Sequence, residues 1–278
     1  MARVIVCAGK RTKHPLIVSG DGIKLFSAEE ICYFLYHNTE TAEEFLADKT
    51  LADFYEKELA LPETAKRLRM LDASEASPKE YATVLFGDTP MYTAEEIEEF
   101  LEGMERYLKL PDWQKKKAKA DRYLERRNFR LAAGVYESLL ASRKELELTD
   151  RTVGNLFHNF AICELHTTGP GTAAVHFADA YEKNHSTESL RSYLMALRLA
   201  KRDGEYSAAI EKYEISEDLT SQIDTILLST VLEAGETPEY QRLVRVKKML
   251  SEGQVNEYRQ EIEKMLVNFK KMYRQDNT

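Results

Sequence analysis

Apolar residues recur at helical spacing along nearly the whole chain after residue 26. Several helix starts are marked by capping boxes, in which a hydroxyl side chain and a later glutamate satisfy the free N–H groups of the first turn. The sequence predicts helix starts at Ser27–Glu30, Thr41–Glu44, Ser77–Glu80 and Thr93–Glu96, and at Thr237-Pro238. The helix after Thr93 is strongly acidic, and its predicted buried face contains Ile97, Phe100, Leu101, Met104 and Leu108.

Only the beginning of the chain has a pattern typical of strands. Arg3–Cys7 is a β-branched run, and Leu16–Val18 and Ile23–Phe26 flank a turn at Ser19–Gly22. The sequence therefore predicts two or three short strands in a small hairpin or meander. Such an element is too small to be stable alone, so we expect it to pack on the helices that follow.

The second half of the chain contains an internal repeat of helix–turn–helix units. In each copy a small residue precedes an aromatic one by four positions: Ala132 and Tyr136, Ala173 and Phe177, Ala209 and Tyr213. The small residues let paired helices approach, and the aromatic side chains fill the space between successive pairs. The first two alanines are 41 residues apart and the last two are 36 apart, which predicts an insertion between the first and second copies.

These units resemble the tetratricopeptide repeat, most plainly in the third copy with Gly204, Tyr206, Ala209, Ile210 and Tyr213. The resemblance covers residues 114–216 and implies a right-handed stack of helix pairs. The last helix has a continuous apolar stripe and is predicted to cap the stack; the stripe contains Val255, Tyr258, Ile262, Met265, Leu266, Phe269, Met272 and Tyr273. The strand pair and Glu30–Leu35 also resemble the start of a family of uncharacterised bacterial proteins with tetratricopeptide-like C-termini, a resemblance that implies no activity.

Composition and charge agree with a mostly α protein built from two modules. Among 278 residues, 43% are hydrophobic, and the low counts of Gly (12) and Pro (7) disfavour all-β and dinucleotide-binding folds. The net charge of −8 lies entirely in residues 1–110, because residues 111–278 have equal numbers of cations and carboxylates. We therefore predict an acidic N-terminal module of short strands and helices at 1–110 and a helical repeat domain at 111–278, divided at Pro111.

Bulk features also predict a cytoplasmic protein without a membrane-spanning segment. No run of apolar residues approaches the length of a membrane span, and the N-terminus lacks the pattern of a signal peptide. The three cysteines, Cys7, Cys32 and Cys163, are far apart and odd in number, which fits a reducing compartment rather than a disulfide framework.

The tetratricopeptide resemblance implies a concave groove, lined by the first helix of each pair, that binds an extended peptide. The predicted partner-binding residues are Lys117, Asn155, His158, Asn159, Arg191, Leu194, Arg198, Lys201 and Arg202. Four cations of the third copy would form a basic wall, which favours an acidic or mixed peptide. The sequence thus predicts an interaction scaffold or adaptor that binds a peptide or partner helix; the alternative is that these residues form ordinary solvated helix surfaces.

A subset of the tetratricopeptide family clamps the terminal carboxylate of a peptide with Lys, Asn, Asn, Lys and Arg side chains. Lys117 and Asn159 match this set, and Arg191 is a basic equivalent. Asp121 and Met195 depart from it, and the Asp121 carboxylate would repel a second carboxylate.

Two other function classes remain open from the sequence. A dense basic stretch at 113–130 with Trp113 and Tyr123 interleaved could bind nucleic acid, although these aromatic residues could instead be packing residues and the cations could pair with the acidic helix at 93–108. His158, Cys163 and His166 do not share one helix face, so no metal site is predicted. We find no catalytic motif and predict neither an enzyme nor a cofactor, leaving an unrecognised site in the N-terminal module as the alternative.

Overall fold

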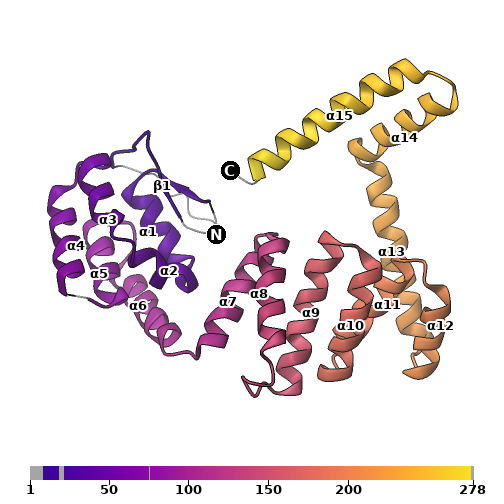
Figure 1. The fold of residues 1–278 in the computed structure, drawn as a ribbon, viewed down its shortest axis with the longest axis horizontal. Coiled ribbons are helices and arrows are strands. Elements are labelled where there is room, and N and C mark those ends of the chain that lie inside the picture. Colours follow the sequence, from indigo (N-terminus) through magenta and orange to yellow (C-terminus); the bar gives the residue numbers. More distant parts are fainter. Residues whose placement is uncertain (1–8, 19–21, 75, 277–278) are drawn as a thin grey trace. The chain divides into compact units, whose positions relative to one another are not determined.

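A computed structural model of the chain describes residues 9–18, 22–74 and 76–276. Most of these residues are helical, so the protein is mostly α, with a small two-stranded antiparallel sheet near the start (Figure 1). The described residues divide into two compact units, one ending at Lys119 and one beginning at Ala120. This division lies inside helix α7 (Asp112–Glu125), whereas the break predicted at Pro111 lies just before that helix.

The first unit combines the sheet with six helices and one π-helical turn. Its elements are β1 (Leu16–Ile17), β2 (Lys24–Leu25), α1 (Ala28–Tyr36), α2 (Thr39–Leu46), α3 (Thr50–Asp53), η1 (Phe54–Glu58), α4 (Pro62–Ser74), α5 (Pro78–Asp88) and α6 (Ala94–Leu108). In the sheet, Leu16 lies opposite Leu25, and Leu25 is buried among the helices as expected. The strand predicted at Arg3–Cys7 lies outside the described residues.

Capping explains where three of these helices, α1, α5 and α6, begin. The Ser27 and Thr93 hydroxyls each accept the backbone N–H three residues later, and the Ser77 N–H donates to Glu80 Oε2 at 2.8 Å. The start predicted at Thr41 is wrong, because α2 begins at Thr39 after the N-cap Asn38. The buried Asn38 amide donates to the Phe34 carbonyl of α1, so a contact between the end of α1 and the start of α2 decides that boundary.

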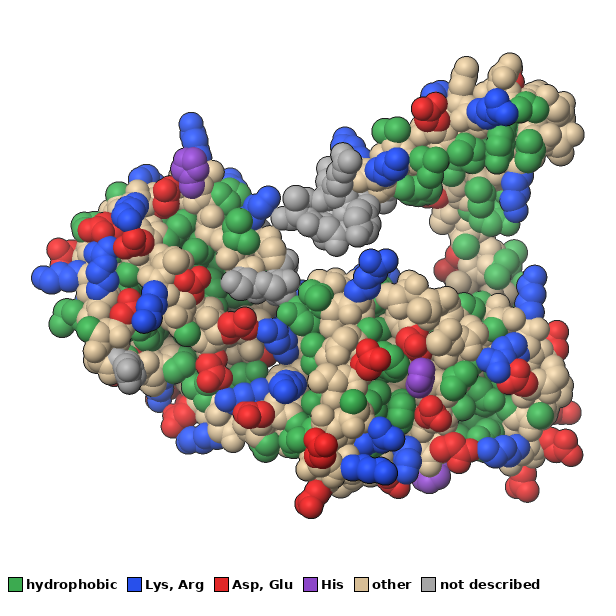
Figure 2. Space-filling view, in the orientation of Figure 1, with side chains coloured by type: hydrophobic (Ala, Val, Ile, Leu, Met, Phe, Trp, Pro, Cys, Tyr) green, Lys and Arg blue, Asp and Glu red, His purple; other side chains and the backbone are tan. Residues whose placement is uncertain are grey.

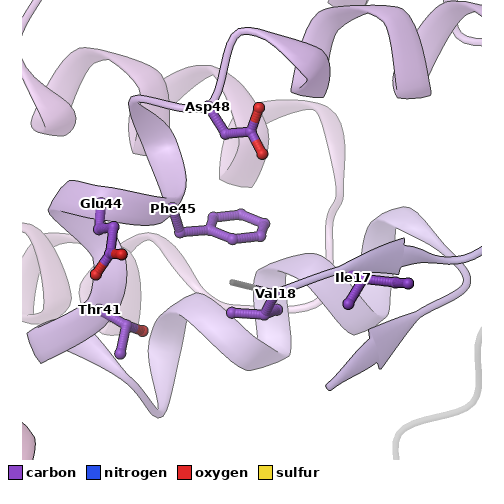
Figure 3. Close-up of a pocket in the computed structure, with 6 residues that line it drawn as sticks. All are labelled: Ile17, Val18, Thr41, Glu44, Phe45 and Asp48. Atoms are coloured by element: carbon purple, nitrogen blue, oxygen red, sulfur yellow. The ribbon is translucent and has the colours of Figure 1, made fainter. Parts of the chain in front are cut away.

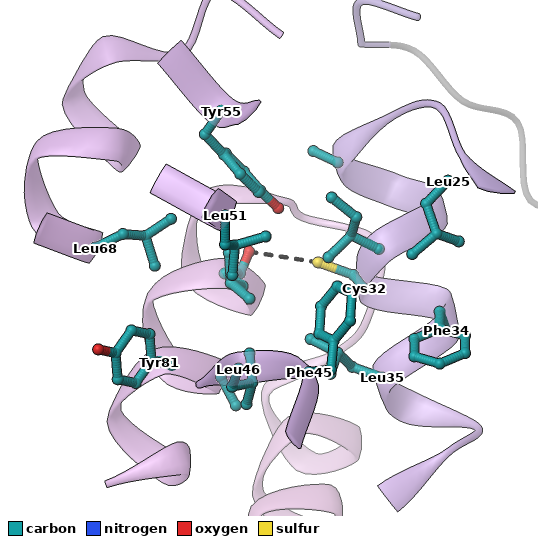
Figure 4. Close-up of a cluster of buried hydrophobic side chains, with 14 of the residues drawn as sticks. Leu25, Cys32, Phe34, Leu35, Phe45, Leu46, Leu51, Tyr55, Leu68 and Tyr81 are labelled. Carbon is teal, nitrogen blue, oxygen red and sulfur yellow. Dashed lines mark hydrogen bonds between the residues drawn. The ribbon is translucent and has the colours of Figure 1, made fainter. Parts of the chain in front are cut away.

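The core of the first unit forms around α1 (Figure 4). The Cys32 thiol is fully buried and donates to the Leu85 carbonyl at 3.5 Å. Burial raises the pKa of Cys32 to about 12 and raises the pKa of Tyr55 well above its usual range. Both groups therefore stay protonated at neutral pH, and Cys32 acts as a small hydrophobic core residue rather than as a nucleophile.

The second unit is a series of helices that follow the end of α7. Its elements are α8 (Phe129–Ala141), α9 (Asp150–Thr167), α10 (Pro170–Asn184), α11 (Thr187–Leu199), α12 (Asp203–Lys212), α13 (Glu217–Glu236), α14 (Pro238–Ser251) and α15 (Val255–Asp276). Figure 1 shows α8, α9, α10 and α11 side by side, and each packs on the next. The pairs α7/α8, α9/α10 and α11/α12 coincide with the three predicted repeat copies, and the connection at 142–149 accounts for the predicted insertion.

The small and aromatic residues of the repeat have the packing roles that their spacing predicts. Ala132, Ala173 and Ala209 are all buried. Tyr136 and Phe177 are buried with them, and the Tyr213 ring of α12 meets the Tyr181 ring of α10 edge-on at 4.9 Å. Aromatic side chains therefore connect successive helix pairs, as expected for a helical repeat.

The prediction that the last helix caps the stack is wrong. Helix α15 packs on α14, and its Val255, Leu266 and Phe269 are 42%, 51% and 55% exposed. Within the described side chains of 217–271, only Ile223 and Val246 are buried. No helix in the described parts of the chain combines the length and the apolar character needed to cross a membrane.

Candidate partner-binding surface

Most of the predicted binding residues lie on the helices of the second unit. Asn155, His158 and Asn159 are on α9, and Arg191, Leu194 and Arg198 are on α11. Lys201 and Arg202 lie in the turn between α11 and α12. Helix α10 packs on both α9 and α11, so it holds these two helices in a fixed relation. Lys117 lies on the part of α7 that belongs to the first unit.

Hydrogen-bonded side chains link the three helices α9, α10 and α11. We call this group the α9–α11 polar cluster; it consists of Asn155, His158, Asn184 and Ser189, with the Glu188 carboxylate beside His158. His158 Nδ1 lies 3.1 Å from the Ser189 hydroxyl. The Asn184 amide donates both to Ser189 Oγ at 3.0 Å and to Asn155 Oδ1 at 3.1 Å. The exposed Asn155 side chain is thereby held in place by groups beneath it.

The position of His158 explains its charge state. Burial lowers the pKa of His158, and the Glu188 carboxylate, 4.0 Å from Nε2, only partly opposes this effect. The imidazole is therefore neutral at neutral pH. It contributes hydrogen bonds and packing against the Phe177 ring rather than positive charge.

The lowered pKa of His158 predicts acid sensitivity of the second unit. The unfolded chain binds a proton near the ordinary histidine pKa of about 6.5, whereas the folded state resists protonation, so the stabilisation is complete above that pH and is lost as pH falls below it. The slope contributed by this one group is at most about 1.4 kcal/mol per pH unit. Denaturant unfolding measured from pH 8 to pH 5 should show a steeper loss for the wild type than for His158→Gln. Equal slopes would contradict this assignment.

The cluster contains a serine and a histidine and lies beside a carboxylate, the set of groups that hydrolase triads use. Its geometry does not fit a nucleophilic site. The Ser189 side chain is buried, with the residue 1% exposed, so an external substrate cannot reach its hydroxyl. The Glu188 carboxylate is also too far from His158 for a hydrogen bond. The arrangement therefore acts as a structural connection between helices.

A second polar group lies where the clamp resemblance placed a peptide carboxylate. Asp121 Oδ1 accepts from the Tyr136 hydroxyl at 2.6 Å and from the Asn159 amide at 3.1 Å. A carboxylate of the chain itself thus occupies the Asn159 donor. This internal contact means that the Asn159 amide connects α9 with α7 and α8. The amide is therefore not available for its predicted role of binding the terminal carboxylate of a peptide.

The predicted basic wall of four cations is smaller in the structure. Arg198 is hydrogen-bonded to Asp224 at 3.1 Å and lies over the Tyr206 ring. Arg202 is paired with Glu205 and donates to a backbone carbonyl of α10 at 2.9 Å. These two cations stabilise the α10–α13 region. Arg191 and Lys201 are exposed and have no ion pair within the described part of the chain.

Leu194 requires a correction among the predicted binding residues. It is fully buried in the hydrophobic core of the second unit, together with Leu190, Leu197 and Phe177. The tetratricopeptide resemblance implied that Leu194 lines the groove. In the structure the side of α11 that carries Leu194 packs against its neighbours, so this residue cannot touch a partner.

The basic stretch on α7 is partly neutralised within the first unit. Lys115 and Lys119 lie 3.2 and 2.7 Å from Glu43 and Glu44 of α2. The sequence had predicted that the cations of α7 pair with the acidic helix α6. In the structure Glu105 of α6 is instead paired with Lys79 and Lys109. The two α7 lysines are only 21% and 32% exposed at their side chains, which weakens the nucleic-acid alternative.

A small hollow in the first unit lies between β1 and α2 (Figure 3). Its volume of about 20 Å³ has room for one water molecule. Ile17, Val18 and Phe45 form its apolar lining, with Thr41, Glu44 and Asp48 at its border. The hollow is too small for a substrate. No cluster of possible metal ligands occurs among the residues that the structure describes.

The sequence pattern did not predict Asn184, Glu188 and Ser189, which lie against Asn155 and His158 in the structure. Asn184 precedes His185, whose left-handed φ of 50° ends α10, so the sequence could have marked it only as a helix terminus. Its hydrogen bond to Asn155 joins residues 29 positions apart and depends on the packing of α9 on α10.

Comparisons with family models, curated proteins and solved structures found no match for this chain.

Proposed function

We propose that the protein is an interaction scaffold or adaptor of the tetratricopeptide type, which binds an acidic peptide or partner helix along α9 and α11. The observation that supports this proposal is the pair of exposed cations, Arg191 and Lys201, that have no acidic partner among the described residues. Asn155 adds a surface amide on the neighbouring first helix, held by the polar cluster. Cationic and amide donors together suit carboxylate groups on a partner.

The spacing of these groups sets the size of peptide that would fit. Arg191 lies eight residues before the end of α11 at Leu199, which corresponds to about 12 Å along the helix axis, and Lys201 follows in the turn. An extended peptide covers that distance in about four residues. A partner with acidic side chains at both ends of such a segment could contact both cations at once. Charge complementarity of this kind mainly supports selectivity and the rate of association.

Charge reversal of the two cations tests the proposed function. An array of acidic, neutral and basic decapeptides, probed with the full chain, should retain the protein on acidic members. Arg191→Glu with Lys201→Glu should weaken that retention by about tenfold, because two attractive contacts become repulsive. Arg198 and Arg202 are unsuitable for the test, since reversing them would also break the ion pairs that stabilise the fold.

The matched control reverses two cations elsewhere in the same unit. Arg130 on α8 and Lys144 after it are exposed and have no ion pair among the described residues. Arg130→Glu with Lys144→Glu changes net charge by the same amount and should leave acidic peptides bound. Equal retention by the two double variants, or equal retention of acidic and basic peptides by the wild type, would contradict the proposal. Circular dichroism would verify that both variants are folded.

A further inference from the structure

The last three helices expose an extended apolar surface, which we call the C-terminal face. It differs from α8 to α12, where every helix buries apolar residues against its neighbours. Figure 2 shows hydrophobic side chains gathered over α14 and α15. The face is formed by Leu228, Val231 and Leu232 of α13, Tyr240, Leu243, Val244 and Leu250 of α14, and Val255, Leu266 and Phe269 of α15, which are 40% to 64% exposed.

The C-terminal face is more apolar than the surface that a helical protein normally exposes to water. Leu228, Val231 and Leu232 form an apolar stripe with helical spacing on α13, on a different side of the helix from the buried Ile223. Large contiguous apolar surfaces of this kind mark a site of interaction.

The size of the C-terminal face fits a contact between two proteins. Full burial of a large aliphatic or aromatic side chain corresponds to about 60 to 120 Å² of apolar area. Ten such side chains, about half exposed, therefore leave roughly 300 to 600 Å² in water. A standard interface takes about 800 Å² from each partner, a little more than half of it apolar. The exposed area matches the apolar share of one side of such an interface.

The charges on these helices indicate what covers the face. Helix α13 carries five carboxylates and no lysine or arginine. Helix α14 carries four cations and one carboxylate, and Lys247 and Lys248 border its apolar stripe. In a two-fold dimer each contact occurs twice, with the roles of the copies exchanged. If α13 of one copy lies against α14 of the other, opposite charges meet at both places.

We propose that a second copy of this chain covers the C-terminal face, with α13 of each copy packed against α14 and α15 of the other. The apolar stripes form the centre of this contact, and the acidic α13 and basic α14 fix its orientation. The proposal goes beyond the peptide-binding function and does not depend on it, since Arg191 and Lys201 take no part in the contact.

Sedimentation of the full chain tests the self-association. The wild type should form a dimer, with a monomer only at the lowest concentrations of a series from micromolar upward. Val231→Glu with Leu232→Glu should shift the protein to monomer, because two glutamates would be buried without partners. The matched control, Leu131→Glu with Val175→Glu, changes two exposed apolar residues of α8 and α10 and should remain a dimer.

A charge exchange tests the orientation and also verifies that the variants fold. One variant has Lys247→Glu and Lys248→Glu, and the other has Glu233→Lys and Glu236→Lys. Each alone brings like charges together at both contacts and should be monomeric. An equal mixture should form a heterodimer, because opposite charges again meet at both contacts.

Three results would overturn the proposal. A wild type that stays monomeric throughout the series would mean that a second copy does not cover the face. An open-ended mixture of larger assemblies would exclude a closed two-fold contact. Charge variants that dimerise alone, or that stay monomeric when mixed, would contradict the pairing of α13 with α14. None of these results bears on binding of acidic peptides, so failure here and failure of the proposed function are distinguishable.

Discussion

Gly154→Ala is expected to lower the stability of the α9/α10 pair by about 2 kcal/mol, although alanine is the better helix former by about 1 kcal/mol. A methyl group at this position would lie 2.6 Å from Asn184 Cβ, 2.7 Å from the Asn184 backbone nitrogen and 2.8 Å from the Ala180 carbonyl oxygen. Two of these atoms belong to the backbone of α10, so they cannot rotate away. The helices must separate, and the Asn184 bonds to Asn155 and Ser189 must lengthen with them.

The measurement is hydrogen exchange of the backbone amides in α9 and α10, which reports local opening free energies. Gly134→Ala provides the matched control, because Gly134 lies within α8 and a methyl group there meets nothing within 4 Å. That substitution should stabilise α8 by up to about 1 kcal/mol. If both substitutions had the same sign, the close approach of α9 and α10 at Gly154 would be contradicted.

The contrast between these two glycines shows why the sequence predicted the fold better than the site. Alanine at 132, 173 and 209 signals close packing through local spacing, and the structure buries all three. The role of Gly154 depends on Ala180 and Asn184, which lie on a different helix. The sequence contains no local pattern that distinguishes Gly154 from Gly134, so only the packed structure separates them.

The same reasoning applies to charged residues on the candidate surface. Helical spacing placed Arg191, Arg198 and Arg202 in one basic group, because they recur along α11 and the turn after it. Whether each is available depends on acidic residues elsewhere: Asp224 of α13 engages Arg198, and Glu205 of α12 engages Arg202. Residue type and spacing identified the cations, and tertiary contacts decided which of them a partner can use.

For helix α15 the sequence predicted the apolar pattern but not the surface that this pattern packs against. The apolar stripe of α15 was predicted correctly as a pattern, and the inference that it caps the stack was wrong. An amphipathic pattern indicates that a helix face is buried, but it does not indicate which surface buries it. For α8 to α12 the neighbouring helices of the same chain cover the face. For α13 to α15 we propose that another copy does.

Asp121→Ala is expected to destabilise the start of the second unit by about 2 to 3 kcal/mol. The substitution removes the carboxylate that accepts from Tyr136 at 2.6 Å, and the Tyr136 hydroxyl is then left in a fully buried position without its acceptor. Loss of a hydrogen bond to a charged group together with an unsatisfied buried donor accounts for that size. Burial and the adjacent carboxylate raise the pKa of Tyr136, so the phenol remains a donor up to high pH.

Asp121→Asn should cost less than Asp121→Ala, because the amide oxygen can still accept from Tyr136 while the charge is lost. Asp179→Ala on α10 is the matched control: Asp179 is exposed and has no ion pair among the described residues, so its loss should change stability by less than about 0.5 kcal/mol. Hydrogen exchange in α8 and α9, the helices that carry Tyr136 and Asn159, gives the readout. If all three variants were equally stable, the Asp121 carboxylate would have no structural role. In that case Asn159 would again be available as a donor for the carboxylate of a bound peptide.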